Sequence, residues 1–203
     1  CLLLSLCLML PFLAGCAPKV EQEPSYSLNT PVSADYKEQI ENIMKHMSTE
    51  QKVGQLFMFS LDGTTLGEKE KQLLSSTHCG NIILYTKNIP DGEQLTSYTT
   101  ALQDTIQKNT KIPAFVGIDQ EGGKVTRIYK DATVFPGAMA TAAAGNPDDV
   151  YTLAKYMGEE LRAYGIHMNF APVMDVNSNS ENPVINSRAY SDDPEKVAVY
   201  SQK

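Results

Sequence analysis

Four short runs of consecutive apolar residues stand out in the chain after Tyr36. They lie at residues 55–61, 80–86, 114–119 and 167–173. Runs of this length, rich in β-branched and aromatic side chains, are typical of strands that are buried on both faces. The sequence therefore predicts four such strands.

Between these runs, apolar residues recur at the spacing of one helix face. Leu95, Tyr98, Leu102 and Ile106 form such a stripe within an expected helix over residues 93–108. Capping signals and further stripes predict five more helices. These are expected around Ile40, Ile43, Met44 and Met47, over 49–53 after a Ser48–Gln51 capping box, over 68–76, after Asn146-Pro147, and after Asp193-Pro194.

Strands that alternate with helices predict an α/β fold with a parallel sheet, because parallel neighbours need crossover connections. Two architectures satisfy this pattern: a closed (β/α)8 barrel of the TIM type and an open doubly wound sheet. No glycine-rich phosphate-binding turn follows the first strand, which disfavours a Rossmann-type sheet. Four strands fit about the first half of a (β/α)8 barrel.

The first residues form a segment of a different kind. Residues 2–14 are apolar and uncharged, but they are too few for a helix that spans a membrane. The run ends in Leu13-Ala14-Gly15-Cys16, which resembles a bacterial lipoprotein signal. This resemblance implies a signal peptide over residues 1–15, cleavage before Cys16, and a lipid on the Cys16 sulfur. The protein would then be anchored in the cell membrane, facing outside the cytoplasm; a plain signal peptide or anchor is the alternative.

Residues 16–35 contain three prolines and almost no periodic apolar pattern, which predicts a flexible tether. The folded part is expected over residues 36–203. Cys79 is then the one cysteine of the folded part, so the sequence predicts no disulfide framework. Because Cys79 adjoins an apolar strand, we expect it to be a small buried apolar residue.

The charge of the chain and its lack of ligand clusters argue against nucleic-acid and metal partners. The chain has 17 basic and 24 acidic side chains, a formal net charge of −7, and no basic stripe that would bind nucleic acid. The sequence has no pair of histidines at the spacing of metal ligands and no cluster of cysteines, so it does not indicate a metal site. We therefore expect neither a nucleic-acid partner nor a metal or other cofactor.

Charged side chains gather where the third and fourth strands end. In parallel α/β folds, ligands bind beyond the carboxyl ends of the strands. Asp119, Glu121 and Arg127 follow the third strand, and Asp175 and Arg188 follow the fourth. A carboxylate at the end of a buried strand needs a partner for its charge, and the two arginines are expected to pair with Asp119. Carboxylates and guanidiniums in fixed positions also suit the hydroxyl groups of a sugar.

Asp119 and Glu121 could form the carboxylate pair of a glycosidase. However, residues two apart in a turn seldom face each other across a sugar. The Gly122-Gly123 pair after Glu121 favours tight backbone packing there over catalysis. Asp175 is expected at the rim of the site.

Three segments resemble glycoside hydrolase family 3, in particular its β-N-acetylhexosaminidases that act on peptidoglycan-derived sugars. They are residues 47–57 (MSTEQKVGQLF), 117–127 (GIDQEGGKVTR) and 170–176 (FAPVMDV), together with Asn182-Pro183 and Arg188. The likeness covers roughly residues 36–203, and the segment around Asp119 is its most specific part.

This resemblance implies a (β/α)8 barrel that removes terminal β-linked N-acetylglucosamine with retention of configuration, through a glycosyl-enzyme intermediate. It implies that Asp119, Arg127 and Arg188 bind the sugar. The family's Lys-His pair, its His–Asp acid/base dyad and its aspartate nucleophile match nothing in this chain, and no catalytic residue is assigned here. Retaining hydrolysis needs two reactive groups that flank the scissile bond. We therefore expect this polypeptide alone to hydrolyse no aryl N-acetylglucosaminide.

Two other functions stay open on the sequence. One is a β-glucosidase or β-xylosidase of the same family, although the run Gln120-Glu121-Gly122-Gly123 favours the acetamido branch. The other is a membrane-tethered lipoprotein that binds sugar without catalysis.

Overall fold

The computed structural model describes residues 34–203, so the predicted signal peptide, Cys16 and all but the end of the predicted tether lie outside the described residues. The chain divides into two units, Cys1–Asn42 and Ile43–Lys203. The described part of the first unit is the beginning of helix α1 (Ala34–His46). The remainder of the fold belongs to the second unit.

Helix α1 confirms the helix predicted from the apolar stripe near the tether. The stripe is not buried, however. Ile40 is 49% exposed, and Ile43 and Met44, in the second unit, are 47% and 49% exposed.

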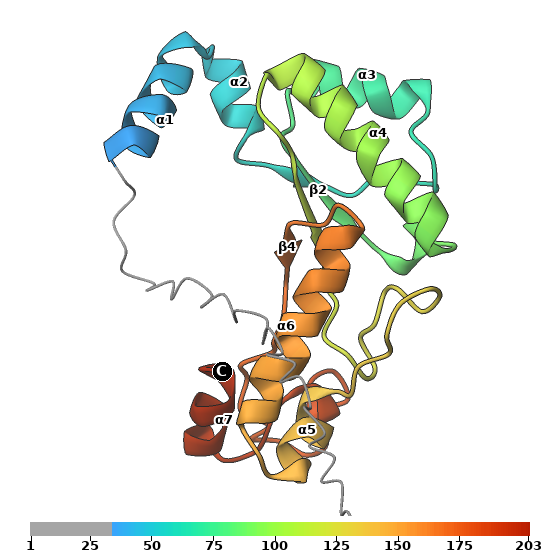
Figure 1. Ribbon diagram of the computed structural model, residues 1–203, viewed down its shortest axis with the longest axis vertical. Coiled ribbons are helices and arrows are strands. Elements are labelled where there is room, and N and C mark those ends of the chain that lie inside the picture. The colour runs from blue at the N-terminus through green and yellow to red at the C-terminus, as the bar shows by residue number, and fades with distance from the viewer. Residues whose placement is uncertain (1–33) are drawn as a thin grey trace, which may run out of the picture. The chain divides into compact units, whose positions relative to one another are not determined.

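The second unit is built on a parallel sheet of four strands in the order β1-β2-β3-β4 (Figure 1). The strands are β1 (Met58–Phe59), β2 (Asn81–Leu84), β3 (Phe115–Ile118) and β4 (Met168–Asn169). In a doubly wound sheet the order of strands reverses at a switch point. Here each strand pairs with the next one along the chain, which is the order required by an arc of a barrel.

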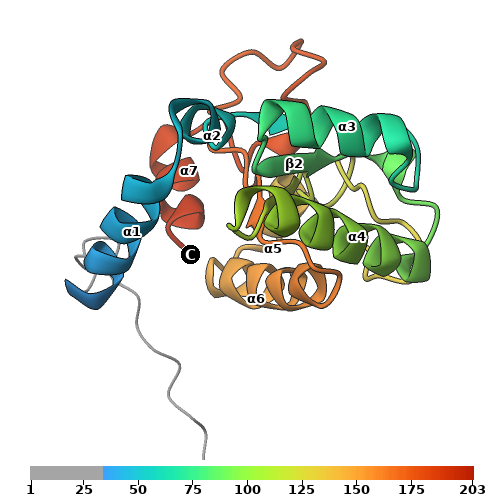
Figure 2. The same ribbon diagram turned by 90° about the horizontal axis from the view of Figure 1, so that it is seen from above.

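Helices alternate with the strands as predicted, and one of them, over residues 138–144, was not predicted from the sequence. They are α2 (Thr49–Gly54), α3 (Glu68–Thr77), α4 (Gly92–Thr110), α5 (Ala138–Ala144), α6 (Asp148–Ala163) and α7 (Pro194–Ser201), with short 3-10 turns η1 (Thr86–Asn88) and η2 (Asn186–Arg188). Ser48 and Gln51 form the expected capping box of α2, and Asp193 caps α7 ahead of Pro194. Figures 1 and 2 show α3 and α4 side by side.

The core lies between the sheet and the helices α3, α4 and α6. The predicted stripe of α4 is buried along its whole length, and Ile82 and Ile118 of the strands are 0% exposed. Burial of a large aliphatic or aromatic side chain contributes about 1.5–3 kcal/mol. This core therefore fixes the strands in register and sets the positions at which their carboxyl ends emerge.

The prediction of strands buried on both faces is wrong for this sheet. Phe115 of β3 is 56% exposed, because the helices of the described residues cover one face of the sheet only. The first strand is also shorter than predicted. The amides of Leu56 and Phe57 donate to Val53 and Gly54 in the turn that ends α2, so these residues are not extended.

Cys79 is a buried small residue, as predicted, with 1% of its surface exposed. Its Sγ lies 3.2 Å from the carbonyl oxygen of Asn81 and 3.4 Å from that of Phe57. Burial raises the pKa of the Cys79 thiol, so the neutral form is favoured. This environment suits packing rather than nucleophilic chemistry.

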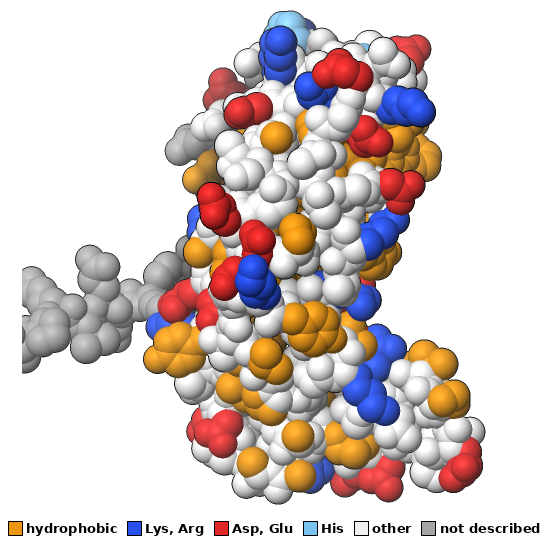
Figure 3. All heavy atoms as spheres, turned by 90° about the vertical axis from the view of Figure 1, so that its right-hand side faces the viewer, with side chains coloured by type: hydrophobic (Ala, Val, Ile, Leu, Met, Phe, Trp, Pro, Cys, Tyr) orange, Lys and Arg blue, Asp and Glu red, His pale blue; other side chains and the backbone are white. Residues whose placement is uncertain are grey.

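The surface carries both signs of charge. On the face drawn in Figure 3, acidic and basic side chains are interspersed over the described residues. Within residues 34–203, no helix is long and apolar enough to cross a membrane, and no three His, Cys, Asp or Glu side chains gather as a metal site requires.

Asn88 joins the exits of the first two strands. Its side chain is 0% exposed, and Nδ2 donates to the carbonyl oxygens of Leu61 (3.0 Å) and Gly63 (2.7 Å). Oδ1 accepts from the backbone N–H of Tyr85 at 3.0 Å. One buried amide thus satisfies three backbone groups in segments that no strand ladder reaches.

Replacement of this amide tests how much it stabilises the fold. Asn88→Ala leaves three backbone groups without their partner, and we expect the free energy of unfolding to fall by about 3 kcal/mol. Urea denaturation of the purified protein measures the change. Gln107→Ala, on the exposed surface of α4, is the control and should change stability by less than about 0.5 kcal/mol. Equal stability of the two variants would contradict this role of Asn88.

Candidate functional site

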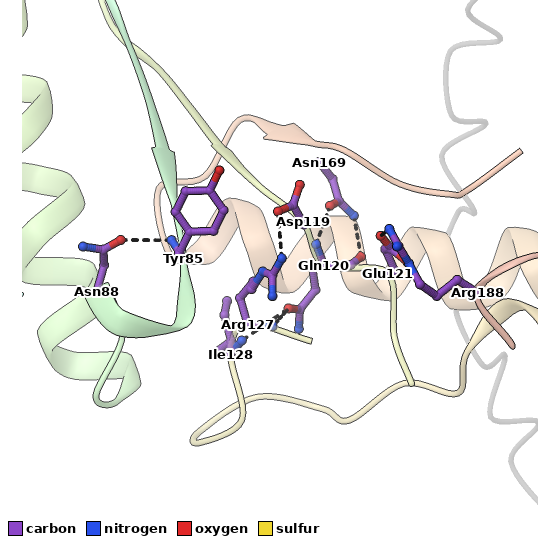
Figure 4. Close-up of polar contacts among 9 residues, drawn as sticks. All are labelled: Tyr85, Asn88, Asp119, Gln120, Glu121, Arg127, Ile128, Asn169 and Arg188. Atoms are coloured by element: carbon purple, nitrogen blue, oxygen red, sulfur yellow. Dashed lines mark hydrogen bonds and ion pairs between the residues drawn. The ribbon is translucent and has the colours of Figure 1, made fainter. Parts of the chain in front are cut away.

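The candidate site begins where β3 ends, at Asp119-Gln120-Glu121 (Figure 4). Gln120 is 3% exposed, and its Oε1 accepts from the backbone N–H groups of Arg127 (2.7 Å) and Ile128 (3.3 Å). The buried amide therefore folds the chain back so that Arg127 returns to the side of Asp119.

Asn169 of β4 fixes the same segment from the other side. Its Oδ1 accepts from the backbone N–H of Gln120, and its Nδ2 donates to the carbonyl oxygen of Gln120, both at 2.9 Å. These two bonds continue the β3–β4 pairing beyond the last ladder residue. The backbone between Asp119 and Glu121 is thus held by side chains from both of its flanks.

Asp119 pairs with one of the two predicted arginines. Arg127 Nη2 donates to Asp119 Oδ2 at 3.0 Å, and the two side chains are 26% and 23% exposed. The guanidinium carbon also lies 5.6 Å from the centre of the Tyr85 ring, a cation–π contact. Arg127 Nε is buried and has no hydrogen-bond partner among the residues that the structure describes. The charge of Arg127 is therefore balanced chiefly by Asp119.

Arg188 does not pair with Asp119, contrary to the expectation for both arginines. It pairs with Glu121, with Nε to Oε2 at 2.8 Å and Nη2 to Oε1 at 2.6 Å. Figure 4 shows the reason: Arg127 lies on one side of the Asp119–Glu121 segment and Arg188 on the other. Each carboxylate thus meets the guanidinium on its own flank.

The charges of the two carboxylates nevertheless act on one group. The pKa of Arg188 is raised, chiefly by its hydrogen bonds to Glu121, and further by the charges of Glu121, Asp119 and Asp175. Asp175 is exposed and acts on Arg188 through its charge, which suits the predicted position at the rim. The charge of Asp119 therefore reaches Arg188, although Asp119 forms its ion pair with Arg127.

The Gly122-Gly123 turn keeps the segment in place. Both residues have positive φ, +84° and +58°, a region that L side chains seldom adopt. A Cβ atom on Gly122 would lie 2.4 Å from the carbonyl oxygen of Pro136, and Gly123 N–H donates to the carbonyl oxygen of Phe135 at 2.9 Å. The close packing expected of the glycines is confirmed, but Glu121 beside them also binds Arg188.

A pocket of about 260 Å³ adjoins the Glu121–Arg188 pair. Its other walls are mainly apolar and come from α5, α6 and the segment after β4, including Met157 and Pro172. Asp119 and Arg127 do not line it. This pocket therefore does not contain all of the residues that the sequence assigned to the sugar.

Sequence reasoning missed three residues that shape the site: Tyr85, Gln120 and Asn169. Tyr85 follows the last residue of β2, and Asn169 is the last residue of β4, so their positions at strand ends were a usable signal. Gln120 also lies just beyond a strand end, but its structural role depends on the return of the chain at Arg127, which the sequence does not show.

A family model described as the glycosyl hydrolase family 3 N terminal domain matches residues 48–203. The chain belongs to glycosyl hydrolase family 3. That domain has a TIM-barrel-type fold, and the parallel sheet of this family 3 chain is consistent with part of such a barrel, so the predicted fold class is confirmed.

Known relatives of this family 3 chain include a protein named beta-hexosaminidase A from Pseudoalteromonas piscicida. It is 42% identical over 139 residues, which are 66% of this chain and 23% of the relative. A beta-N-acetylglucosaminidase/beta-glucosidase from Cellulomonas fimi is 31% identical over 163 residues, 79% of this chain and 27% of the relative. The chain therefore spans about a quarter of these two proteins.

A solved structure of a family 3 enzyme is also similar to this chain. The glycoside hydrolase family 3 beta-N-acetylglucosaminidase from Paenibacillus sp. str. FPU-7 superposes with a TM-score of 0.73 at 40% identity. The match covers 76% of the family 3 chain described here and 29% of the other.

The glycine turn yields a direct test of the site's backbone. Gly122→Ala places a side chain at positive φ and against a carbonyl oxygen, so we expect the free energy of unfolding to fall by about 3 kcal/mol. Gly158→Ala is the matched control, because this exposed glycine of α6 has no atom within 4 Å of an added Cβ. It should stabilise the protein by about 0.5–1 kcal/mol. Chemical denaturation compares the two, and a neutral Gly122→Ala would contradict the geometry.

Proposed function

We propose that a protein containing this chain hydrolyses terminal β-linked N-acetylglucosamine from peptidoglycan-derived or other glycans, with retention of configuration. Membership of family 3 supports glycoside hydrolysis, and the names of the relatives support N-acetylglucosamine as the sugar. The carrying observation is the arrangement at the end of β3, where Asp119 and Arg127 lie paired beside the Glu121–Arg188 pair.

The chemistry of these residues suits the binding of a sugar rather than bond cleavage. Asp119 and Arg127 are about one quarter exposed, so a ligand can reach a carboxylate and a guanidinium whose positions are already fixed. Preorganised charged hydrogen-bonding groups select adjacent hydroxyls with little ordering cost. Asp119 and Glu121 are each held by an arginine, which leaves neither as a free acid or nucleophile.

A retaining mechanism needs an acid/base and a nucleophile on opposite sides of the scissile bond. The residues described here supply no such pair at the site. We therefore assign to Asp119, Arg127 and Arg188 the binding and orientation of the sugar, and to Asp175 a place at the rim. We propose that residues other than those described here supply the reactive groups.

The test compares turnover of three aryl glycosides by the complete protein. We expect para-nitrophenyl N-acetyl-β-glucosaminide to be preferred over the β-glucoside and the β-xyloside, and NMR to detect the β-anomer as first product. The β-glucoside is the informative competitor, since one relative carries both activities in its name. A preference for the β-glucoside or the β-xyloside would replace the proposed substrate, and absence of turnover would favour a protein that only binds sugar.

Asp119→Asn tests the binding role within the same assay. The variant keeps the shape of the side chain but removes its charge, and Arg127 loses its ionic partner. We expect KM to rise and kcat to fall together, with kcat/KM about 100-fold lower. Asp104→Asn removes the same charge from the exposed surface of α4 and should leave both constants unchanged. Unchanged kinetics for Asp119→Asn would make the residue purely structural.

We propose that the protein is anchored in the cell membrane through a lipid on Cys16 and faces outside the cytoplasm. The support is the sequence Leu13-Ala14-Gly15-Cys16 after an uncharged apolar run. Two or more acyl chains hold a protein stably on a membrane, because each buried CH₂ contributes about 0.8 kcal/mol.

Metabolic labelling with a palmitate analogue in a bacterial host tests the anchor. The unaltered protein should be labelled and should sediment with membranes, whereas Cys16→Ser should be unlabelled. Cys7→Ser, within the apolar run, is the control and should still be labelled. Equal labelling of Cys16→Ser and the unaltered protein would refute the assignment of Cys16.

A further inference from the structure

Glu121 is the most shielded carboxylate of the site. Its side chain is 8% exposed, compared with 23% for Asp119. Both of its oxygens accept from Arg188, at 2.8 and 2.6 Å, in a two-point contact that fixes the plane of the guanidinium (Figure 4). Glu121 therefore has little surface for a substrate, but it determines the orientation of a side chain that keeps 26% of its surface exposed.

The contacts of Arg188 show which of its donors remain. An arginine has five N–H groups. Nε and one N–H of Nη2 bind Glu121, and one N–H of Nη1 binds the carbonyl oxygen of Val184 at 3.2 Å. One N–H on each Nη atom is left. Glu121 thus occupies the Nε–Nη2 edge of the guanidinium, and one N–H on each Nη atom remains available to other acceptors.

The segments that carry Glu121 and Arg188 are held in different ways. Glu121 N–H donates to the carbonyl oxygen of Val125 at 2.8 Å, and the glycine turn and Asn169 brace its neighbours. Arg188 instead lies in the long segment between β4 and α7, within the short turn η2. The carboxylate is therefore the fixed partner, and the arginine takes its position from it.

We propose that Glu121 is a positioning residue, which holds Arg188 so that its two remaining N–H donors meet adjacent oxygens of the bound sugar. The inference rests on the proposed function, and it deepens that function by assigning a role to a residue that the sequence did not place in the sugar site. Glu121 itself makes no contact with the sugar. Its effect on activity passes entirely through Arg188.

The test is a double-mutant cycle in the complete enzyme with Glu121→Gln and Arg188→Ala. An amide at position 121 keeps the shape but offers one acceptor instead of two, so Arg188 loses its fixed plane. We expect KM for the aryl N-acetyl-β-glucosaminide to rise about tenfold or more in Glu121→Gln, with a smaller change in kcat. Glu181→Gln removes the same charge from an exposed position in the segment that carries Arg188, and should leave KM unchanged.

The cycle separates positioning from a merely structural role. If Glu121 acts through Arg188, Glu121→Gln has no further effect on KM once Arg188 is alanine, because coupled residues are non-additive. Additive effects would overturn the proposal, as would an unchanged KM in Glu121→Gln. Arg188→Ala leaves the shielded Glu121 charge unpaired, so unfolding is measured for every variant, and the comparison uses folded protein only.

The same measurements distinguish failure of this inference from failure of the proposed function. If the unaltered enzyme prefers a β-glucoside or β-xyloside, the proposed substrate is wrong, and the cycle is carried out with that glycoside. An additive cycle in an enzyme that does cleave N-acetylglucosaminides refutes the positioning role alone. Absence of turnover on all three glycosides would overturn both.

Discussion

Charge compensation at the carboxyl end of β3 is the constraint on which the site depends. Asp119 and Glu121 emerge two residues apart from a strand whose neighbouring residues are buried, and a carboxylate in such surroundings is costly without a partner. The fold meets this requirement with two guanidiniums that approach from opposite flanks. The segment after β3 places Arg127 beside Asp119, and the segment after β4 places Arg188 beside Glu121. Both segments therefore contribute an arginine to residues 119–121.

A rigid backbone makes this compensation useful for recognition. Gln120 turns inward between the two carboxylates and binds the returning chain, while Asn169 binds both backbone groups of Gln120. Together these two amides fix where the charged groups lie. The parallel sheet supplies the frame, and its sequential strand order brings the exits of β3 and β4 next to each other.

The sequence predicted those features that depend on local pattern. The stripe of α4 is buried as its spacing indicates, whereas the similarly spaced stripe of α1 is about half exposed, so the spacing predicts the helix but not its burial. The partner of Arg188 was not predictable in this way, because Asp119 and Glu121 have the same charge and differ only in which flank they face. The exposure of Phe115 was also missed, since an apolar run does not reveal how many faces of a strand are covered.

The shielding of Glu121 has a consequence for the influence of dissolved ions. At physiological ionic strength, salt screens exposed charges over about 8 Å, but it acts much less on pairs removed from solvent. An exposed pair such as Lys87 with Asp62, whose side chains are 52% and 90% exposed, weakens as salt is added. The ion pair of Arg188 with Glu121, whose side chain is only 8% exposed, is far less sensitive to salt. The contact between the segment after β4 and the end of β3 therefore depends little on ionic strength.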